Sequence, residues 1–301
     1  MIHTSQHSPR VLLLALLLSA LCFGVTGLAS THPDEKMKPE EVVAKHLASI
    51  GKPEDIAASK TRVITGQNNT KLKIAGTIRE VSGPAQFASD GQKVLLTMVF
   101  NSDNYPYEKI AWDGDRLTVA NLPRGGRSAL TNFFVTQDLI FKHGLVGGAL
   151  SSAWPLGSLD PEKGKLSYSG TDKIDGRPVH RLKYQPRRGD LKVNLYFDAE
   201  TFQHLRSEYE YTISPKMGPR PSSSMGGPNS TSQTLSRYKL TEEFSNFKTV
   251  GKVTLPQSYK LQIVVEAQPQ TLDYTIEFNQ FAFDQTIEAS AFNVSSPTDG
   301  N

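Results

Sequence analysis

Apolar and polar residues alternate along much of the chain with a period of two, the spacing of side chains on the two faces of a β-strand. From Leu191 to Phe197 every second residue is apolar, and the positions between them are mostly polar. The segments 72–78, 259–265 and 272–278 show the same alternation. One apolar and one polar face per strand is typical of an antiparallel sheet whose outer face is in water. We therefore expect a mainly β protein.

Short turns separate several of these runs. Asp-Gly pairs stand at 90–91, 113–114 and 175–176, and such pairs favour tight hairpin turns because both residues tolerate positive φ. Strands do not alternate with helices, which argues against a parallel sheet. Several alternating runs exceed the usual strand length of about five or six residues, and long strands twist a sheet until it curls. The predicted architecture is an antiparallel curled sheet that forms an unclosed half-barrel.

Two segments have a helical pattern instead. The first opens with Pro-Glu-Glu at 39–41, carries apolar residues three or four positions apart and ends at Gly51, so it predicts an N-terminal amphipathic helix. The second, 127–143, contains many large apolar residues and is also predicted to be helical. It is too apolar to lie in water. We expect it to cover the concave side of the sheet as an apolar lid helix.

The first residues have the pattern of an export signal. Arg10 is followed by an almost unbroken apolar run from Val11 to Val25 and by small residues up to position 29. The run is too short for a comfortable membrane crossing, and it ends in residues that a signal peptidase accepts. Residues 1–29 are therefore predicted to be a cleaved signal peptide. The mature protein is predicted to be periplasmic or secreted, with no integral membrane segment after cleavage.

The rest of the chain is predicted to form one domain. Residues 30–38 are polar and are expected to be a mobile leader, and 39–297 are expected to hold the half-barrel. Residues 214–233 consist largely of Pro, Ser, Gly and Asn, a composition that cannot bury enough apolar surface to order itself. We interpret them as a flexible insertion, and a lid or a segment that docks a partner is the alternative.

Composition narrows the function classes. The formal net charge of +3 among 301 residues is too small for the concentrated basic face of a nucleic-acid-binding protein, so no nucleic acid partner is expected. The single cysteine, Cys22, lies within the predicted signal, so we expect neither a disulfide nor a thiolate metal site in the mature chain. Lipidation of Cys22 is the alternative, but Ser19 and Leu21 do not fit the usual lipoprotein signal.

Catalytic motifs are missing from the sequence. It contains no His-Glu-x-x-His, no Gly-x-Ser-x-Gly and no phosphate-binding loop. His204 and Glu208 fall on one face of a predicted strand, where a charged ladder in water explains them better than a metal site does. We expect no enzyme activity, no cofactor and no metal, and an envelope hydrolase is the least favoured hypothesis.

Several segments of the sequence together resemble a known family. They are the Pro-Glu-Glu helix that ends at Ile50-Gly51, the segment 195–202 that runs into 205–208, the segment 247–256 and the terminal 291–294. From Pro39 to Val294 the chain is similar to the bacterial outer-membrane lipoprotein-sorting (LolA/LolB-like) superfamily. The resemblance implies an unclosed barrel with a helical lid and an apolar cavity that receives acyl chains. Some relatives instead sense envelope stress.

The lining of such a cavity is predicted from the inward strand positions and from the lid. The candidate ligand-binding residues are Phe133, Phe134, Val193, Leu195, Phe197, Tyr209 and Tyr211. Packing of a closed core by the same side chains is the alternative. The predicted function is a non-enzymatic periplasmic or envelope binding protein that shelters a lipid, an acyl chain or a lipoprotein.

A second hypothesis is an envelope sensor or a protein-interaction module without a bound lipid. Its docking site for an envelope protein partner would be the insertion 214–233 or a cluster of basic residues around one predicted hairpin. The cluster consists of Arg177, His180, Arg181, Lys183, Arg187, Arg188 and Lys192. Nearby acidic residues favour a solvated, charge-balanced rim over a site for anionic lipid headgroups or an acidic partner.

Overall fold

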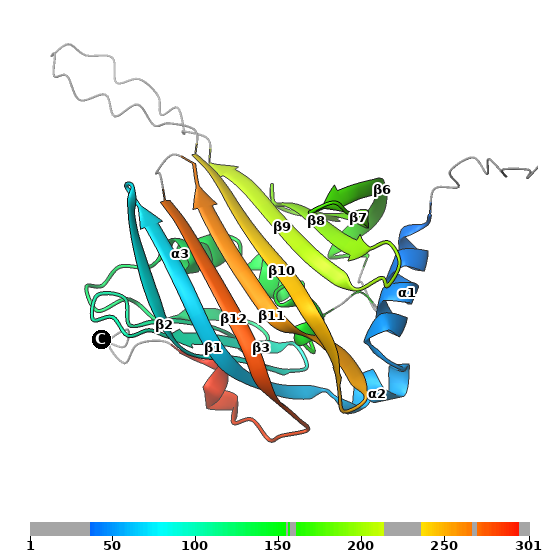
Figure 1. Cartoon of the computed structure of the whole chain (residues 1–301), viewed down its shortest axis with the longest axis horizontal. Helices are drawn as coiled ribbons and strands as arrows, with labels where there is room; N and C mark the ends of the chain where they lie inside the picture. Colours follow the sequence, from blue (N-terminus) through cyan, green and yellow to red (C-terminus); the bar gives the residue numbers. More distant parts are fainter. Residues whose placement is uncertain (1–36, 155, 157–160, 214–235, 267–269, 295–301) are drawn as a thin grey trace, which may run out of the picture. The chain divides into compact units, whose positions relative to one another are not determined.

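Twelve antiparallel strands form a single sheet that curves without closing into a barrel (Figure 1). The computed structural model describes residues 37–154, 156, 161–213, 236–266 and 270–294, which belong to one compact unit that begins at Lys36. The predicted signal peptide, most of the predicted leader and the predicted insertion 214–233 lie outside the described residues. The predicted fold class, a mainly β unclosed half-barrel, is confirmed.

The elements have the following bounds. The strands are β1 (Thr61–Ile74), β2 (Thr77–Asp90), β3 (Lys93–Val99), β4 (Tyr107–Trp112), β5 (Leu117–Val119), β6 (Gly164–Ile174), β7 (Arg177–Pro186), β8 (Lys192–Asp198), β9 (His204–Ile213), β10 (Ser236–Val250), β11 (Val253–Val265) and β12 (Gln270–Phe283). The helices are α1 (Pro39–Ile50), α2 (Pro53–Ala58), α3 (Ala129–Thr136) and α4 (Leu139–Lys142), with short 3₁₀ helices η1 (Gly148–Leu150) and η2 (Ala289–Phe292). None of the helices in this described part of the chain has the length and apolar character that a membrane crossing requires.

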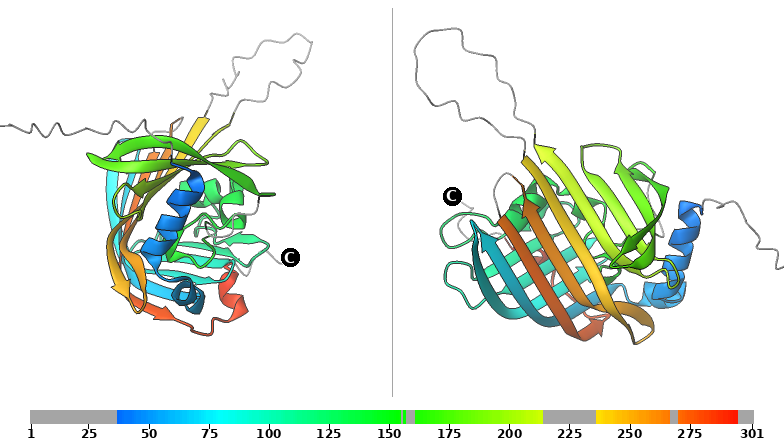
Figure 2. Two further views of the ribbon diagram at one scale, coloured as in Figure 1. Left: turned by 90° about the vertical axis from the view of Figure 1, so that its right-hand side faces the viewer. Right: turned by 45° about the horizontal axis from the view of Figure 1, so that its top comes forward.

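Two series of hairpins share the sheet and meet in its middle. The strand order is β5-β4-β3-β2-β1-β12-β11-β10-β9-β8-β7-β6, so every neighbouring pair except β1 with β12 is consecutive in sequence. β5 and β6 therefore stand at opposite edges, although they follow one another along the chain. The connection between them contains α3, α4 and η1 and crosses the hollow of the sheet. Figure 2 shows these helices on the concave side.

A two-residue turn decides which side chains face the hollow at the β1–β2 hairpin. Ala75 and Gly76 have φ angles of 48° and 83° and connect the two strands, so the prediction of one continuous strand over 72–78 is wrong. Apolar and polar residues go on alternating through the turn, but the two-residue loop pairs Ile74 with Thr77 and so exchanges the faces of the odd and even positions. As a result Ile78 is 62% exposed, whereas Arg79 faces the hollow.

The predicted N-terminal helix is confirmed as α1, and a histidine attaches it to the sheet. His46 is 1% exposed. Its Nδ1 donates to the Phe202 carbonyl at 2.9 Å, and its Nε2 accepts from Trp154 Nε1 at 3.0 Å. One ring nitrogen donates a hydrogen bond and the other accepts one, which is the pattern of a neutral imidazole. Burial lowers the pKa of His46 to about 4, so the ring stays neutral in the folded protein.

The predicted lid helix at 127–143 forms as two shorter helices, α3 and α4. α3 begins after Ser128, whose hydroxyl accepts a hydrogen bond from the Thr131 backbone N–H at 3.0 Å, and it ends at Thr136. α4 follows almost at once. The fully buried side chains of the two helices are Leu130, Phe133, Phe134, Ile140 and Phe141. The pair therefore packs its apolar side chains into the hollow, as expected from the composition of the segment.

We expect His46→Gln to weaken the acid sensitivity of the fold. As the pH falls from 6.5 towards 4, the unfolded chain takes up a proton on His46 that the folded protein does not, so the contribution of His46 to the free energy of unfolding decreases. This group alone accounts for up to roughly 3 kcal/mol. Glutamine keeps one donor and one acceptor but does not titrate.

Urea unfolding of both proteins at pH 7 and pH 4.5 measures the difference. His204, whose pKa is lowered first by burial and then by the neighbouring His46, is present in both proteins, so the effect of its burial cancels and the measured difference contains only His46 and its interaction with His204. An equal loss of stability in the two proteins would rule out His46 as the source.

Candidate functional site

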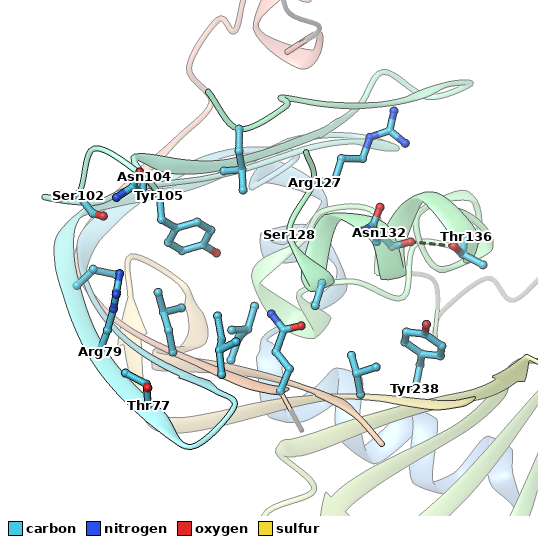
Figure 3. Close-up of a pocket in the computed structure, with 18 of the residues that line it drawn as sticks. Thr77, Arg79, Ser102, Asn104, Tyr105, Arg127, Ser128, Asn132, Thr136 and Tyr238 are labelled. Atoms are coloured by element: carbon cyan, nitrogen blue, oxygen red, sulfur yellow. Dashed lines mark hydrogen bonds between the residues drawn. The ribbon is translucent and has the colours of Figure 1, made fainter. Parts of the chain in front are cut away.

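A cavity of about 810 Å³ lies between the concave face of the sheet and α3 (Figure 3). Its size falls within the range of about 300–1,000 Å³ that is usual for small-molecule sites. Strands β1, β2, β11 and β12 supply an apolar wall, and α3 supplies polar and small side chains opposite. The apolar lining residues are Leu72, Ile74, Val81, Leu122, Ala129, Ile213, Val265 and Leu272.

The cavity exists because the strands extend further than the helices that cover them. β1, β9 and β12 have 14, 10 and 14 residues, whereas α3 has eight. The lining residues that stand at strand ends are Ile74, Thr77, Ile213, Tyr238, Val265 and Gln270. These strand ends therefore extend beyond the helices, and the part of the sheet that they form is not covered by the helical layer.

Large apolar side chains are exposed at the mouth of this cavity. Ile74 is 49% exposed and Ile213 is 46% exposed, and both line it. They end β1 and β9, with β12, β11 and β10 between them, so they are separate apolar residues along the mouth and not one contiguous patch. The mouth can thus contact an apolar molecule that enters the cavity.

A buried carboxyl group stands behind the polar side of the cavity. Glu108 on β4 is 1% exposed and accepts hydrogen bonds from the hydroxyls of Tyr105 and of Tyr274 on β12. The two tyrosine hydroxyls are 2.6 Å apart. Tyr105 and Ser128, the N-cap of α3, line the cavity, and Figure 3 shows the Tyr105 ring projecting into it.

The protonation of this carboxyl group is set by its surroundings. Burial raises the pKa of Glu108 to about 7, although hydrogen bonds from Ser128, Tyr105 and Tyr274 favour the ionised form and oppose the shift. The link to Ser128 connects the sheet to the first turn of α3. Glu108 is not among the residues predicted from the sequence. Its signal was a carboxylate on the same face of a strand as Ile110 and Trp112.

A second buried carboxyl group fixes the crossing segment further inside. Glu242 on β10 is fully buried and accepts hydrogen bonds from the hydroxyls of Tyr209 at 2.7 Å and of Tyr259. It also accepts the Gly147 backbone N–H at 2.8 Å. Burial raises the pKa of Glu242 as well. This cluster holds the loop between α4 and η1 against the sheet.

The seven predicted ligand-binding residues all face the hollow, but they do not gather at one site. Tyr211 lines the cavity, and its ring centroid lies 5.2 Å from that of Phe133. Tyr209 belongs to the Glu242 cluster. The remaining four residues, Phe134, Val193, Leu195 and Phe197, are fully buried in the core. Contact of these residues with a ligand stays a prediction.

His204 does not face outward, contrary to the sequence-based expectation. The β8–β9 register shifts so that Tyr196 pairs with Arg206 and Phe197 with His204, which leaves Leu205 as an extra residue. This bulge turns the His204 ring inward, where it is 1% exposed. The described residues contain no group of His, Cys and carboxylates that could hold a metal ion.

The predicted basic cluster is largely neutralised where the structure describes it. Ion pairs join Arg177 to Asp198, Arg181 to Asp172, Arg187 to Glu162 and Lys192 to Glu210. This pairing agrees with a solvated, charge-balanced rim. A role in docking an acidic partner stays a prediction.

Comparison with known proteins finds similarity in structure alone. No protein-family model and no curated protein matches the sequence. A LolA superfamily protein from Nitrosomonas europaea is 11% identical with a TM-score of 0.45, covering 86% of this chain and 98% of that protein. A DUF1329 family protein from Desulfovibrio piger is 12% identical with a TM-score of 0.45, covering 85% and 98%.

A third solved structure is a putative outer membrane lipoprotein-sorting protein domain from Vibrio parahaemolyticus. It is 12% identical with a TM-score of 0.42, covering 84% of this chain and 95% of that domain. The matched structures thus include the superfamily that the sequence resembles. Similarity at this level identifies neither a ligand nor a partner, which have to be inferred from the side chains of this chain.

We expect Glu108→Gln to remove a loss of stability that the wild-type protein shows as the pH rises. The folded protein keeps the Glu108 proton up to about pH 7, because burial raises its pKa, whereas the unfolded chain releases it near 4.5. The contribution of Glu108 to the free energy of unfolding therefore decreases between pH 4.5 and 7, by up to roughly 3 kcal/mol.

Urea unfolding at both pH values measures this slope in the two proteins. Glu242, whose pKa is also raised, is unchanged in the variant and cancels. A variant with the wild-type slope would show that Glu108 is already ionised in the folded protein at pH 4.5.

Proposed function

We propose that this chain is a non-enzymatic binding protein that shelters an amphiphile, such as a lipid, an acyl chain or a lipid-modified protein, in the cavity between the sheet and α3. The observation that carries this proposal is the 810 Å³ cavity with an apolar strand wall and exposed isoleucines at its mouth. The export signal predicted at 1–29 supports a periplasmic or secreted location.

The physical basis of binding is the transfer of an apolar chain from water to the strand wall. Each methylene group that leaves water contributes about 0.8 kcal/mol. Leu72, Val81 and Leu272 already project into the cavity, so the site is preformed on strands and needs little reordering when it fills. Tyr211, one of the predicted ligand-binding residues, contributes to the same wall.

The polar groups of the cavity support binding rather than catalysis. Its described lining contains no His, Asp or Glu side chain. The buried carboxyl group behind the lining, Glu108, is shielded by Tyr105 and already accepts two tyrosine hydroxyls. A nucleophile next to a general base, which most hydrolytic sites need, is therefore missing from these lining residues.

The test is to fill the cavity with a side chain of the protein itself. We expect Ala129→Trp to weaken binding of the uncharged apolar dye Nile red about tenfold or more, because the indole occupies the space beside α3. The melting temperature should stay within about 4 °C of the wild type, since the added ring enters a hollow rather than packed core.

Val135→Trp is the matched control, because Val135 lies on the same helix, is 40% exposed and does not line the cavity. Dye fluorescence and mass spectrometry of lipids extracted from the purified protein are the two measurements. A wild-type protein that binds no dye and contains no extractable lipid would overturn the proposal.

A further inference from the structure

We propose that the cavity prefers an anionic amphiphile, with the negatively charged headgroup bound by Arg79 at the mouth. This inference rests on the proposed function and names the chemical class of the ligand. The shared chemistry is a carboxylate or phosphate on an apolar chain.

The register of the β1–β2 hairpin places the Arg79 side chain on the inner face. Arg79 is the cross-strand partner of Leu72 and stands two residues before Val81, and all three line the cavity. An apolar or small residue would be expected at such a position. Arg79 is exposed at the mouth, so its apolar stem covers the strand wall while its guanidinium stays in water, where it can meet a charged headgroup.

No described acidic residue supplies an opposite charge to Arg79. The described lining contains two arginines, Arg79 and Arg127, and no Asp or Glu. Among the described residues neither arginine forms an ion pair, and Arg127 Nε donates instead to the neutral Asn121 side chain at 3.3 Å. By contrast, Arg181 and Arg206 elsewhere on the sheet pair with carboxylates.

Neutral hydrogen-bonding groups stand near Arg79. Figure 3 shows Ser102 and Asn104 on the same side of the cavity as Arg79, with Thr77 close by. A guanidinium presents parallel N–H donors that match the oxygens of a carboxylate or phosphate, and such charge-assisted bonds are the strong ones. This side of the mouth therefore offers a cation with supporting polar groups.

Three further charged groups stand near the cavity, of which the exposed Asp103, between Ser102 and Asn104, does not line it. Arg127 stands on the opposite side and points outward in Figure 3, so it adds to the positive potential of the mouth rather than to the headgroup contact. Glu108 lies behind Tyr105 and Ser128. Because burial raises its pKa to about 7, it is only partly ionised at neutral pH and offsets little of this potential.

The experiment compares three ligands that share one chain and differ in headgroup. Oleate, oleyl phosphate and oleyl alcohol displace Nile red from the full chain at concentrations below micelle formation. We expect the wild-type protein to bind at least one anion about tenfold more tightly than the alcohol. Arg79→Gln should abolish this preference and leave the affinity for oleyl alcohol unchanged.

Two variants serve as controls. Arg79→Lys keeps the charge but loses the fork of donors, so it should retain part of the preference. Arg124→Gln removes one exposed positive charge from the loop before α3 at a position that does not line the cavity, and it should behave like the wild type. Raising the salt concentration should reduce the preference in the wild type.

The outcomes separate this inference from the proposed function. Loss of preference for oleate, for oleyl phosphate or for both in Arg79→Gln supports it and identifies the headgroup. Equal affinity of the wild type for all three ligands, or a preference that survives Arg79→Gln, overturns the inference while binding in the cavity stands. Absence of binding of all three ligands and of the dye contradicts the proposed function itself.

Discussion

The pairing of β1 with β12 is the contact on which the rest of the architecture depends. It runs in register from Arg62 opposite Phe283 to Ile74 opposite Gln270, with one irregularity at Gly66. By joining the beginning of the domain to its end, it moves β5 and β6 to opposite edges of the sheet. The chain between these edges then has to traverse the hollow. The helical layer and the cavity above it both follow from this requirement.

Two buried carboxyl groups determine where that crossing segment lies. Glu242 binds the Gly147 backbone N–H from the middle of the sheet, and Glu108 reaches Ser128 at the start of α3. Burying such groups costs free energy that tyrosine hydroxyls only partly offset. In exchange, polar bonds inside an apolar interior select one position for the segment, because every alternative leaves a buried group without a partner. The cavity keeps its shape as a consequence.

Local patterns predicted most of the elements but not all of their faces. The period of two indicated the strands, and the Asp175-Gly176 pair indicated a hairpin that the structure contains. The alternation predicted the wrong face after Ala75-Gly76, where the chain reverses although apolar and polar residues go on alternating. It also predicted the wrong face at His204, because a bulge at Leu205 inserts one residue. Arg79 was overlooked for the first reason, and the inward position of His204 for the second.

Contacts between segments far apart in the sequence could not be predicted from local patterns. The union of β1 with β12 joins segments some two hundred residues apart, and only the hydrophobic faces of both strands hint at it. The Glu108 cluster likewise combines a loop, two strands and a helix cap. A carboxylate among apolar strand positions indicates a buried polar cluster. Its hydrogen-bond partners can be identified only from the assembled sheet, because they lie far apart in the sequence.

The brevity of α3 has a consequence for how this architecture can change. The strand wall is held by backbone bonds along the whole sheet, whereas the roof of the hollow is a single helix of eight residues. A change in the length or the side chains of that helix would alter the free space beside it while every strand register is preserved. The volume of the cavity is thus adjustable through one segment, independently of the sheet that supports it.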